Sequence, residues 1–122
     1  MRSKYHNKKV TFDGIEFDSK KEMYRYIRLK SMQEEGLISE LRLQVPYELI
    51  PAIYEEEIVK LKTKTKVVKR CAQKAVKYVA DFVYKDHYGY EVVEDSKGLR
   101  TKEYLLKKKM MRAFLGILIK EV

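Results

Sequence analysis

The chain has 122 residues and 45% of them are hydrophobic, which suits one folded domain with a modest core and argues against a disordered chain. Lys and Arg total 27 against 18 Asp and Glu, a formal net charge of +9, so we expect a polyanionic partner, nucleic acid before an anionic membrane surface. The single cysteine, Cys71, excludes an intrachain disulfide and a multi-cysteine zinc site.

Neither a membrane span nor a secretion signal is expected. The longest apolar run, residues 113–119, is too short to cross a bilayer. No apolar leader precedes a cleavage site of small residues, so we expect a cytoplasmic protein with a single domain over residues 1–122.

The first elements are a small hairpin and a helix, which follow a loose basic start at residues 1–9. Asp13-Gly14 is the preferred pair for a type I′ turn between two short alternating runs, 10–12 and 15–17. A helix is expected over residues 19–35, because Ser19 with Glu22 fits a capping box and Gly36 is a natural stop.

A proline-containing strand and a charged segment come next. Residues 41–50 predict a strand at a sheet edge or with a bulge, since Pro46 lies within it. The acidic run 55–57 is expected to be a solvated surface. Residues 58–77 are basic with no acid, and alternating Lys and Thr at 62–66 favour a strand arm that contacts DNA, whereas residues 67–76 also fit a helix.

Two strands, 77–85 and 90–97, form the hairpin around which the chain is organised, with turn residues at 86–89. Strand propensity does not explain the charged residues within them, Asp81, Glu94, Asp95 and Lys97. Alternation places Asp95 and Lys97 on one face and Glu94 on the other. Asp81 can approach Asp95 across the ladder, and facing carboxylates suit a hard cation such as Mg²⁺.

A second helix is expected over residues 102–115, capped by Thr101 and ended by Gly116. Its periodicity predicts a core face made of Leu106, Met110, Ala113 and Phe114. Residues 117–122 are apolar enough for a final buried strand.

An Asp on one strand followed by Asp-x-Lys on the next resembles the signature of the PD-(D/E)xK nucleases, the restriction-endonuclease-like superfamily. The likeness runs from Gly14 to Val122, and it is closest to small phage-encoded proteins compared with Holliday-junction resolvases. The matching motifs in this chain are GIEFDSKKE, QVPYEL, YVADFVY, VVEDSKG and TKEYLLKKKM.

This resemblance implies an α/β fold with a mixed sheet, an αβββαβ core behind a short N-terminal hairpin. Three strands form a meander, and the last strand returns beside the first by a helical crossover. It also implies that Asp81 and Asp95 bind Mg²⁺ or Mn²⁺, that Lys97 acts on the attacking water or the phosphate, and that Glu22 and Gln44 assist.

Each site residue also has a structural interpretation. Asp81 could hydrogen-bond a turn or pair with a lysine, and Asp95 with Lys97 could be a surface ion pair. Glu22 could serve only the helix cap, and Gln44 could be a polar residue of a half-exposed strand. A bulge would exchange Glu94 for Asp95 as the ligand.

The functional expectation is a metal-dependent endonuclease acting on DNA, including branched DNA, as a homodimer without a small-molecule cofactor. A binding module that does not cleave, on the same fold, is the alternative, and a basic partner-binding protein is a third. The residues expected to hold DNA are Lys62, Lys64, Lys66, Lys69, Arg70, Arg100, Lys102 and Lys108.

Overall fold

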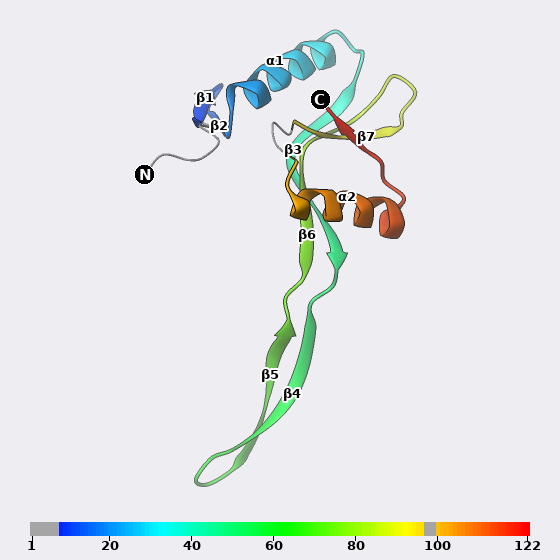
Figure 1. Ribbon diagram of the computed structural model, residues 1–122. Coiled ribbons are helices and arrows are strands. Elements are labelled where there is room, and N and C mark those ends of the chain that lie inside the picture. Colours follow the sequence, from blue (N-terminus) through cyan, green and yellow to red (C-terminus); the bar gives the residue numbers. More distant parts are fainter. Residues whose placement is uncertain (1–7, 97–99) are drawn as a thin grey trace.

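The computed structural model describes residues 8–96 and 100–122. Within them, two helices and eight strands follow one another along the chain (Figure 1). They are β1 (Val10–Phe12), β2 (Ile15–Phe17), α1 (Lys20–Glu34), β3 (Ser39–Ile50), β4 (Ile53–Lys60), β5 (Thr65–Gln73), β6 (Val76–Lys85), β7 (Glu91–Asp95), α2 (Lys102–Leu115) and β8 (Ile119–Glu121).

A mixed four-stranded sheet of order β3-β6-β7-β8 forms the centre, which confirms the expected α/β class. β3, β6 and β7 are antiparallel, as a meander requires, and β8 runs parallel to β7 after the α2 crossover. The expectation that the last strand lies beside the first was wrong. Only a short connection separates α2 from β8, and β8 pairs with the free edge of β7. Two strands, β6 and β7, therefore lie between β8 and β3.

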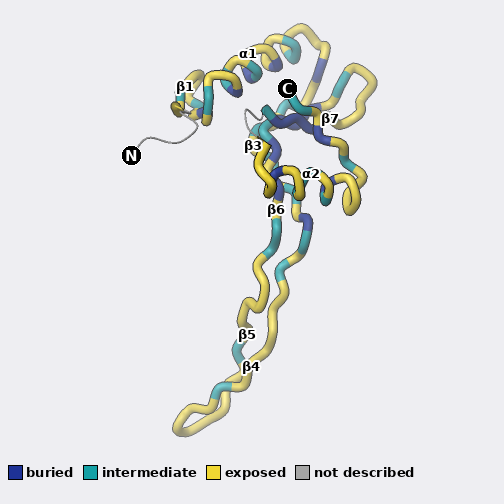
Figure 2. Tube along the Cα trace, viewed as in Figure 1, coloured by how far each residue is buried: buried dark blue, intermediate teal, exposed yellow. Residues whose placement is uncertain are grey.

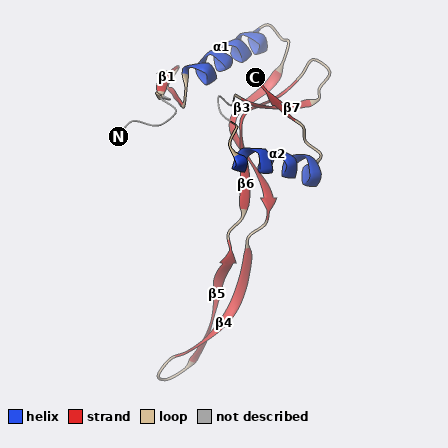
Figure 3. Cartoon of the chain, in the orientation of Figure 1, coloured by secondary structure: helices blue, strands red, loops and turns tan. Residues whose placement is uncertain are grey.

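The sheet has a helix on each face, as the colouring in Figure 3 makes clear. Successive residues of β6 point to opposite sides: Phe82 packs in the core with Tyr26 and Leu29 of α1, whereas Val83 packs in the core with Met111 of α2. Aromatic residues such as Phe82 and β-branched residues such as Val83 are good strand formers, because they pack well on a pleated surface. The result is a three-layer arrangement with two separate cores.

Local signals set the helix ends. The Ser19 hydroxyl accepts a hydrogen bond from the Glu22 amide at 3.2 Å, and the Thr101 hydroxyl accepts one from the Tyr104 amide at 3.1 Å. Gly116 has φ 69°, the left-handed conformation that ends α2. Among the described residues, no helix is both long enough and apolar enough to cross a membrane.

The core face of α2 differs from the expected one. Tyr104 and Met111 are its buried residues, while Leu106 and Phe114 are each 58% exposed. Apolar side chains lie nearly all around this helix, so periodicity alone does not select one face. Contact with β6 and β8 makes that selection.

β3 is an edge strand with register shifts near both of its ends, as Pro46 predicted. Its backbone turns left-handed at Gln44, where φ is 51°. Leu43 before this position packs in the α1 core, and Val45 after it packs in the α2 core. The twist at Gln44 therefore changes which helix the strand contacts.

β4 and β5 form a separate two-stranded sheet that we call the arm, residues 53–73. It continues away from the central sheet beyond the ends of β3 and β6 and is almost wholly exposed (Figures 1 and 2). The strand expected over residues 62–66 begins only at Thr65, and residues 61–64 connect β4 to β5. The helix considered for residues 67–76 is wrong, because residues 67–73 belong to β5. The facing pair Ile58 and Val67 shows why, because β-branched residues favour a ladder.

Candidate functional site

Gln44, Asp81 and Asp95 occupy neighbouring positions across three strands. The pairs Leu43–Phe82 and Val45–Ala80 set Gln44 opposite Asp81 in the β3–β6 ladder. Continuing the β6–β7 ladder by one residue beyond its pair Phe82–Glu94 sets Asp81 opposite Asp95. Strand alternation predicted that Asp81 can approach Asp95, and this register gives the two residues facing positions.

Gln44 connects this row to α1. Its Nε2 donates to Glu22 Oε1 at 3.0 Å and lies 3.4 Å from Asp81 Oδ1. Oxygens of two carboxylates, one from the first turn of α1 and one from the middle of β6, therefore meet at a single amide nitrogen.

Glu22 is only 5% exposed. Burial, followed by the negative charges of Asp81 and Asp18, raises the pKa of its carboxyl to about 7, and Asp95 adds to the increase. The capping role accounts for its amide, which donates to Ser19, but its carboxylate faces the row. Glu22 thus serves the cap through its backbone and the acidic cluster through its side chain.

Asp81 is half-buried and is held by the residue that follows Asp95. Its Oδ2 accepts hydrogen bonds from the Ser96 amide at 2.9 Å and the Ser96 hydroxyl at 3.1 Å. These two donors fix the carboxylate so that Oδ1 faces Gln44. Lys97, the expected signature lysine, lies outside the described residues.

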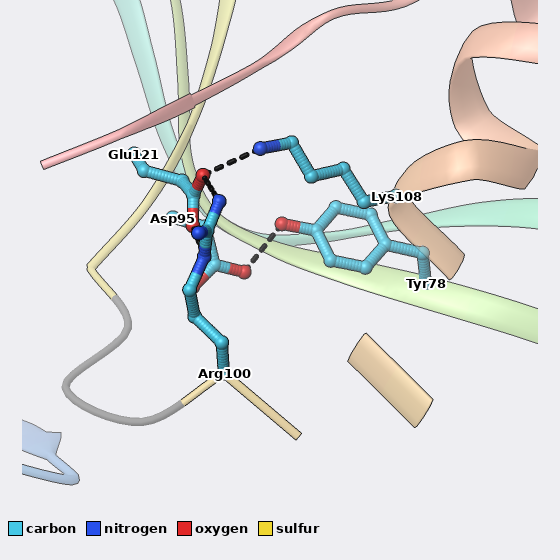
Figure 4. A network of polar contacts seen from close by, with 5 residues as sticks. All are labelled: Tyr78, Asp95, Arg100, Lys108 and Glu121. Carbon is cyan, nitrogen blue, oxygen red and sulfur yellow. Dashed lines mark hydrogen bonds and ion pairs between the residues drawn. The ribbon is translucent and has the colours of Figure 1, made fainter. Parts of the chain in front are cut away.

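Asp95 is fully buried, and its Oδ2 accepts a hydrogen bond from the Tyr78 hydroxyl at 2.5 Å, shown in Figure 4. Burial and this bond raise the pKa of the Tyr78 phenol well above its usual range. A proton on Tyr78 is therefore retained at all physiological pH values, and the phenol remains a donor to Asp95.

Glu94 points to the other face of β7, toward α1. Arg25 donates to it through Nε at 2.8 Å and Nη2 at 2.6 Å, Tyr84 donates its hydroxyl, and Lys120 Nζ lies 3.9 Å away. The β6–β7 pairing is regular up to Glu94, without the bulge that would exchange it for Asp95. Glu94 is a neutralised structural carboxylate.

Two of the residues expected to hold DNA meet beside Asp95. Glu121, opposite Asp95 in the β7–β8 ladder, accepts from Arg100 Nε at 2.8 Å and Nη2 at 2.5 Å, and from Lys108 Nζ at 2.5 Å (Figure 4). Arg100 and Lys108 hold the pKa of Glu121 at about 2. This cluster lies at the edge of the acidic row.

The other expected DNA-binding residues lie apart. Lys102 is exposed at the start of α2, and the remaining five are all on the exposed arm, at Lys62, Lys64, Lys66, Lys69 and Arg70. Sequence analysis did not single out Tyr78 as the partner of Asp95, nor Ser96 or Glu121. The position of Ser96 between Asp95 and Lys97 was the only signal that could have found one of them.

The acidic row offers only oxygen ligands from carboxylates and one amide. Within residues 8–96 and 100–122, no three His, Cys, Asp or Glu side chains are close enough together to hold a metal ion as they stand. Glu22 and Asp81 are the pair that already converges, through Gln44.

The chain belongs to a family described as proteins of unknown function, DUF1064, which it matches over residues 2–117. No curated protein and no solved structure matches it significantly.

Proposed function

We propose that this DUF1064 family member is a nuclease that hydrolyses phosphodiester bonds of DNA with the help of a divalent cation. The observation that carries the proposal is the meeting of Glu22 and Asp81 at the Gln44 amide, with Asp95 in the adjoining position of the row. Two acids that converge on one neutral amide, with a third in the adjoining position, repel one another unless a cation lies between them.

The donor chemistry of the site fits Mg²⁺ or Mn²⁺. Mg²⁺ takes oxygen ligands and is commonly held by one or two carboxylates together with waters and substrate phosphates, so a cage of three protein carboxylates is not required. Glu22, Asp81 and Asp95 are the residues that would hold it. The Gln44 side chain also carries a carbonyl oxygen, which a rotation of the amide would offer in place of Nε2.

The backbone at Gln44 supports a functional role for this position. A non-glycine residue at φ 51° is uncommon and costs on the order of 1 kcal/mol or more, and such residues gather at active sites. Here the left-handed turn places the amide between two carboxylates. A polar residue of an ordinary edge strand needs no such conformation.

Each residue has a distinct role in the proposed reaction. A cation held by Glu22, Asp81 and Asp95 would lower the pKa of a water and would offset charge on the phosphate in the transition state. Ser96 orients Asp81 through two hydrogen bonds, and Tyr78 fixes Asp95. Lys97, two residues beyond Asp95, is proposed to orient the attacking water or to stabilise the phosphate.

Arg100, before α2, and Lys108, on α2, both pair with Glu121 of β8, the strand next to β7. The same donors suit a phosphate oxygen, because Arg binds carboxylates and phosphates with one geometry. We therefore include them in the surface that holds the DNA backbone next to the site.

The test is a cleavage assay on plasmid, duplex and branched DNA in Mg²⁺ or in EDTA, with wild type, Asp81→Asn and Lys97→Ala. Cleavage that requires Mg²⁺ and is lost in both variants, while DNA binding persists, supports the proposal. DNA binding without cleavage by the wild type would identify a non-cleaving module. Cleavage by Lys97→Ala at the wild-type rate would remove Lys97 from the proposed reaction.

A further inference from the structure

The arm has no partner of its own within the described part of the chain. Its strands pair only with each other, in a two-stranded sheet separate from the central one. An isolated two-stranded hairpin is marginally stable in water. Nevertheless the arm displays large apolar side chains to solvent, which indicates a surface that something else covers.

Charge is distributed unevenly along the arm. We call residues 60–66 the tip, and it contains Lys60, Lys62, Lys64 and Lys66 with no acid. We call residues 54–58 with 67–71 the stem. There Glu56 faces Lys69 in the ladder, and Arg70 forms an ion pair with Glu57. The acidic run on β4 therefore compensates the cations of the stem, and the uncompensated positive charge is at the tip.

One face of the stem carries large exposed apolar side chains. Ile58 and Val67 are directly opposite each other and are 68% and 59% exposed, and Tyr54, two alternations earlier on β4, is 61% exposed. Side chains two or four residues apart on a strand share a face, so these three form one short stripe leading toward the lysines, and the facing pair Glu56 and Lys69 lies within it.

We propose that the arm lies along a groove of double-stranded DNA, with the tip lysines on phosphates and the apolar stripe toward the groove floor. A two-stranded ribbon fits the major groove, which is about 12 Å wide, and apolar side chains there contact thymine methyl groups. Four uncompensated lysines at the end of a ribbon match a duplex backbone in charge. The identity of this polyanion rests on the proposed function.

The fold also sets where the tip contacts DNA relative to the site. At about 3.3 Å per residue, Lys60 lies at most about 50 Å along the chain from Gln44, and Lys66 lies equally far from Asp81. Since the duplex rises about 3.4 Å per base pair, the tip contacts should lie up to about 15 base pairs from the scissile phosphate. The arm thus predicts a binding site much longer on one side of the cut.

The experiment compares binding to fluorescein-labelled duplexes of about 12 and about 30 base pairs by anisotropy, in EDTA so that no cleavage occurs. Three proteins are used: wild type, the tip variant Lys62→Ala/Lys64→Ala/Lys66→Ala, and a variant that removes three exposed cations of α2, Lys102→Ala/Lys109→Ala/Arg112→Ala. A longer duplex offers more overlapping binding positions and so raises the apparent affinity of all three proteins by the same factor. This factor cancels when the proteins are compared with one another.

We expect the tip variant to bind the short duplex like wild type and the long duplex at least about tenfold more weakly. Its salt dependence on the long duplex should fall by up to about three units of slope, at about 0.9 for each lost phosphate contact. The α2 variant is the control for the loss of three positive charges, and any weakening that it shows should be similar for the two duplexes. Unchanged binding to the short duplex also shows that the tip variant is folded.

An equal loss on both duplexes, or no loss on the long one, would overturn the proposal. The proposal would also be overturned if the tip lysines raised the affinity for single-stranded DNA of the same length as much as that for duplex, since single-stranded DNA has no groove. Binding to phosphatidylserine vesicles that depends on the tip, without binding to duplex, would overturn it as well. A protein that shows the length effect but never cuts DNA contradicts the nuclease proposal alone. A protein that cuts without the length effect contradicts the arm proposal alone.

Discussion

Glu94 and Glu22 are both buried glutamates at the boundary between α1 and the sheet, but their surroundings are opposite. Glu94, fully buried, receives two hydrogen bonds from Arg25 and one from Tyr84. Glu22, 5% exposed, receives a hydrogen bond from the neutral Gln44, and the charged groups that shift its pKa are the acids Asp81, Asp18 and Asp95.

This difference separates a carboxylate whose charge the fold compensates from one that, under the proposed function, binds a cation. A buried charge is stable when an opposite charge and hydrogen bonds satisfy it, as at Glu94. α1 supplies both kinds of group within one turn, since Glu22 and Arg25 are three residues apart on the same helix face. Because Arg25 donates both of its hydrogen bonds to Glu94, its positive charge neutralises Glu94 and not Glu22.

The largest effect should distinguish the neighbours Asp95 and Glu94. Asp95→Asn should lower cleavage by about a thousandfold or more, because it removes a charge from the acidic row. Glu94→Gln should stay within about tenfold of wild type, measured at a temperature where melting curves show both variants folded. The reverse ranking would mean that Glu94 acts in the site and that Asp95 has the structural role.

Removing the cation of the structural pair should cost stability rather than catalysis. Arg25→Ala leaves Glu94 buried without its main partner, and such a loss costs about 3–5 kcal/mol. Urea unfolding at pH 7 measures it. The double variant Arg25→Met/Glu94→Gln is the control and should recover most of the stability. An Arg25→Ala protein as stable as wild type would show that Glu94 needs no cation.

Glu22 should make the metal-free protein less stable as pH rises. Its pKa is raised from 4.5 to about 7 in the folded state, so its contribution is fully present below pH 4.5 and is lost as pH rises through about 7. The loss amounts to about 3 kcal/mol, at 1.36 kcal/mol per pKa unit. Urea midpoints in EDTA at pH 5 and pH 8 measure it.

Glu22→Gln should abolish that loss, because glutamine carries no charge and its backbone amide can still donate to the Ser19 hydroxyl. Its stability at pH 8 should exceed that of wild type, and its cleavage rate should fall. Full cleavage by Glu22→Gln would remove Glu22 from the site and leave it a helix-cap residue.

The smallest effect should come from a neutral donor. Ser96→Ala removes one of two hydrogen bonds to Asp81 Oδ2 and keeps the other, from the amide. One such bond is worth about 1 kcal/mol, so cleavage should fall about fivefold. Ser31→Ala, an exposed serine on α1, is the control and should change nothing. A loss as large as that of Asp95→Asn would mean that Ser96 contacts substrate or metal directly.

Short-range chemistry made much of this fold predictable. Asp13 and Gly14 have φ values of 55° and 74°, as a type I′ turn requires, and Ser19 and Thr101 cap their helices. These features depend on a few neighbouring residues. The α2 face and the place of β8 depend on partners distant in the sequence, and they were the features predicted wrongly.

The candidate site divides in the same way. Strand alternation was enough to set Asp81 near Asp95 and to separate Asp95 from Glu94. Tyr78 and Glu121 were missed, because a tyrosine in a strand and an acid near a terminus carry no signal until the ladder registers are known. Gln44 was singled out by resemblance, but its left-handed backbone could not be read from residue type.

The direct pairing of Ile50 with Val76 has a consequence for how the chain folds. β3 and β6 are far apart in sequence, and bringing their ends together through a free loop of that length costs about 3 kcal/mol in chain entropy. A hairpin forms in about 1–10 μs, sooner than most long-range contacts. Once β4 and β5 have paired, the arm already holds those two ends side by side. The arm therefore shortens the search for the central ladder, and the first long-range step of folding becomes a local one.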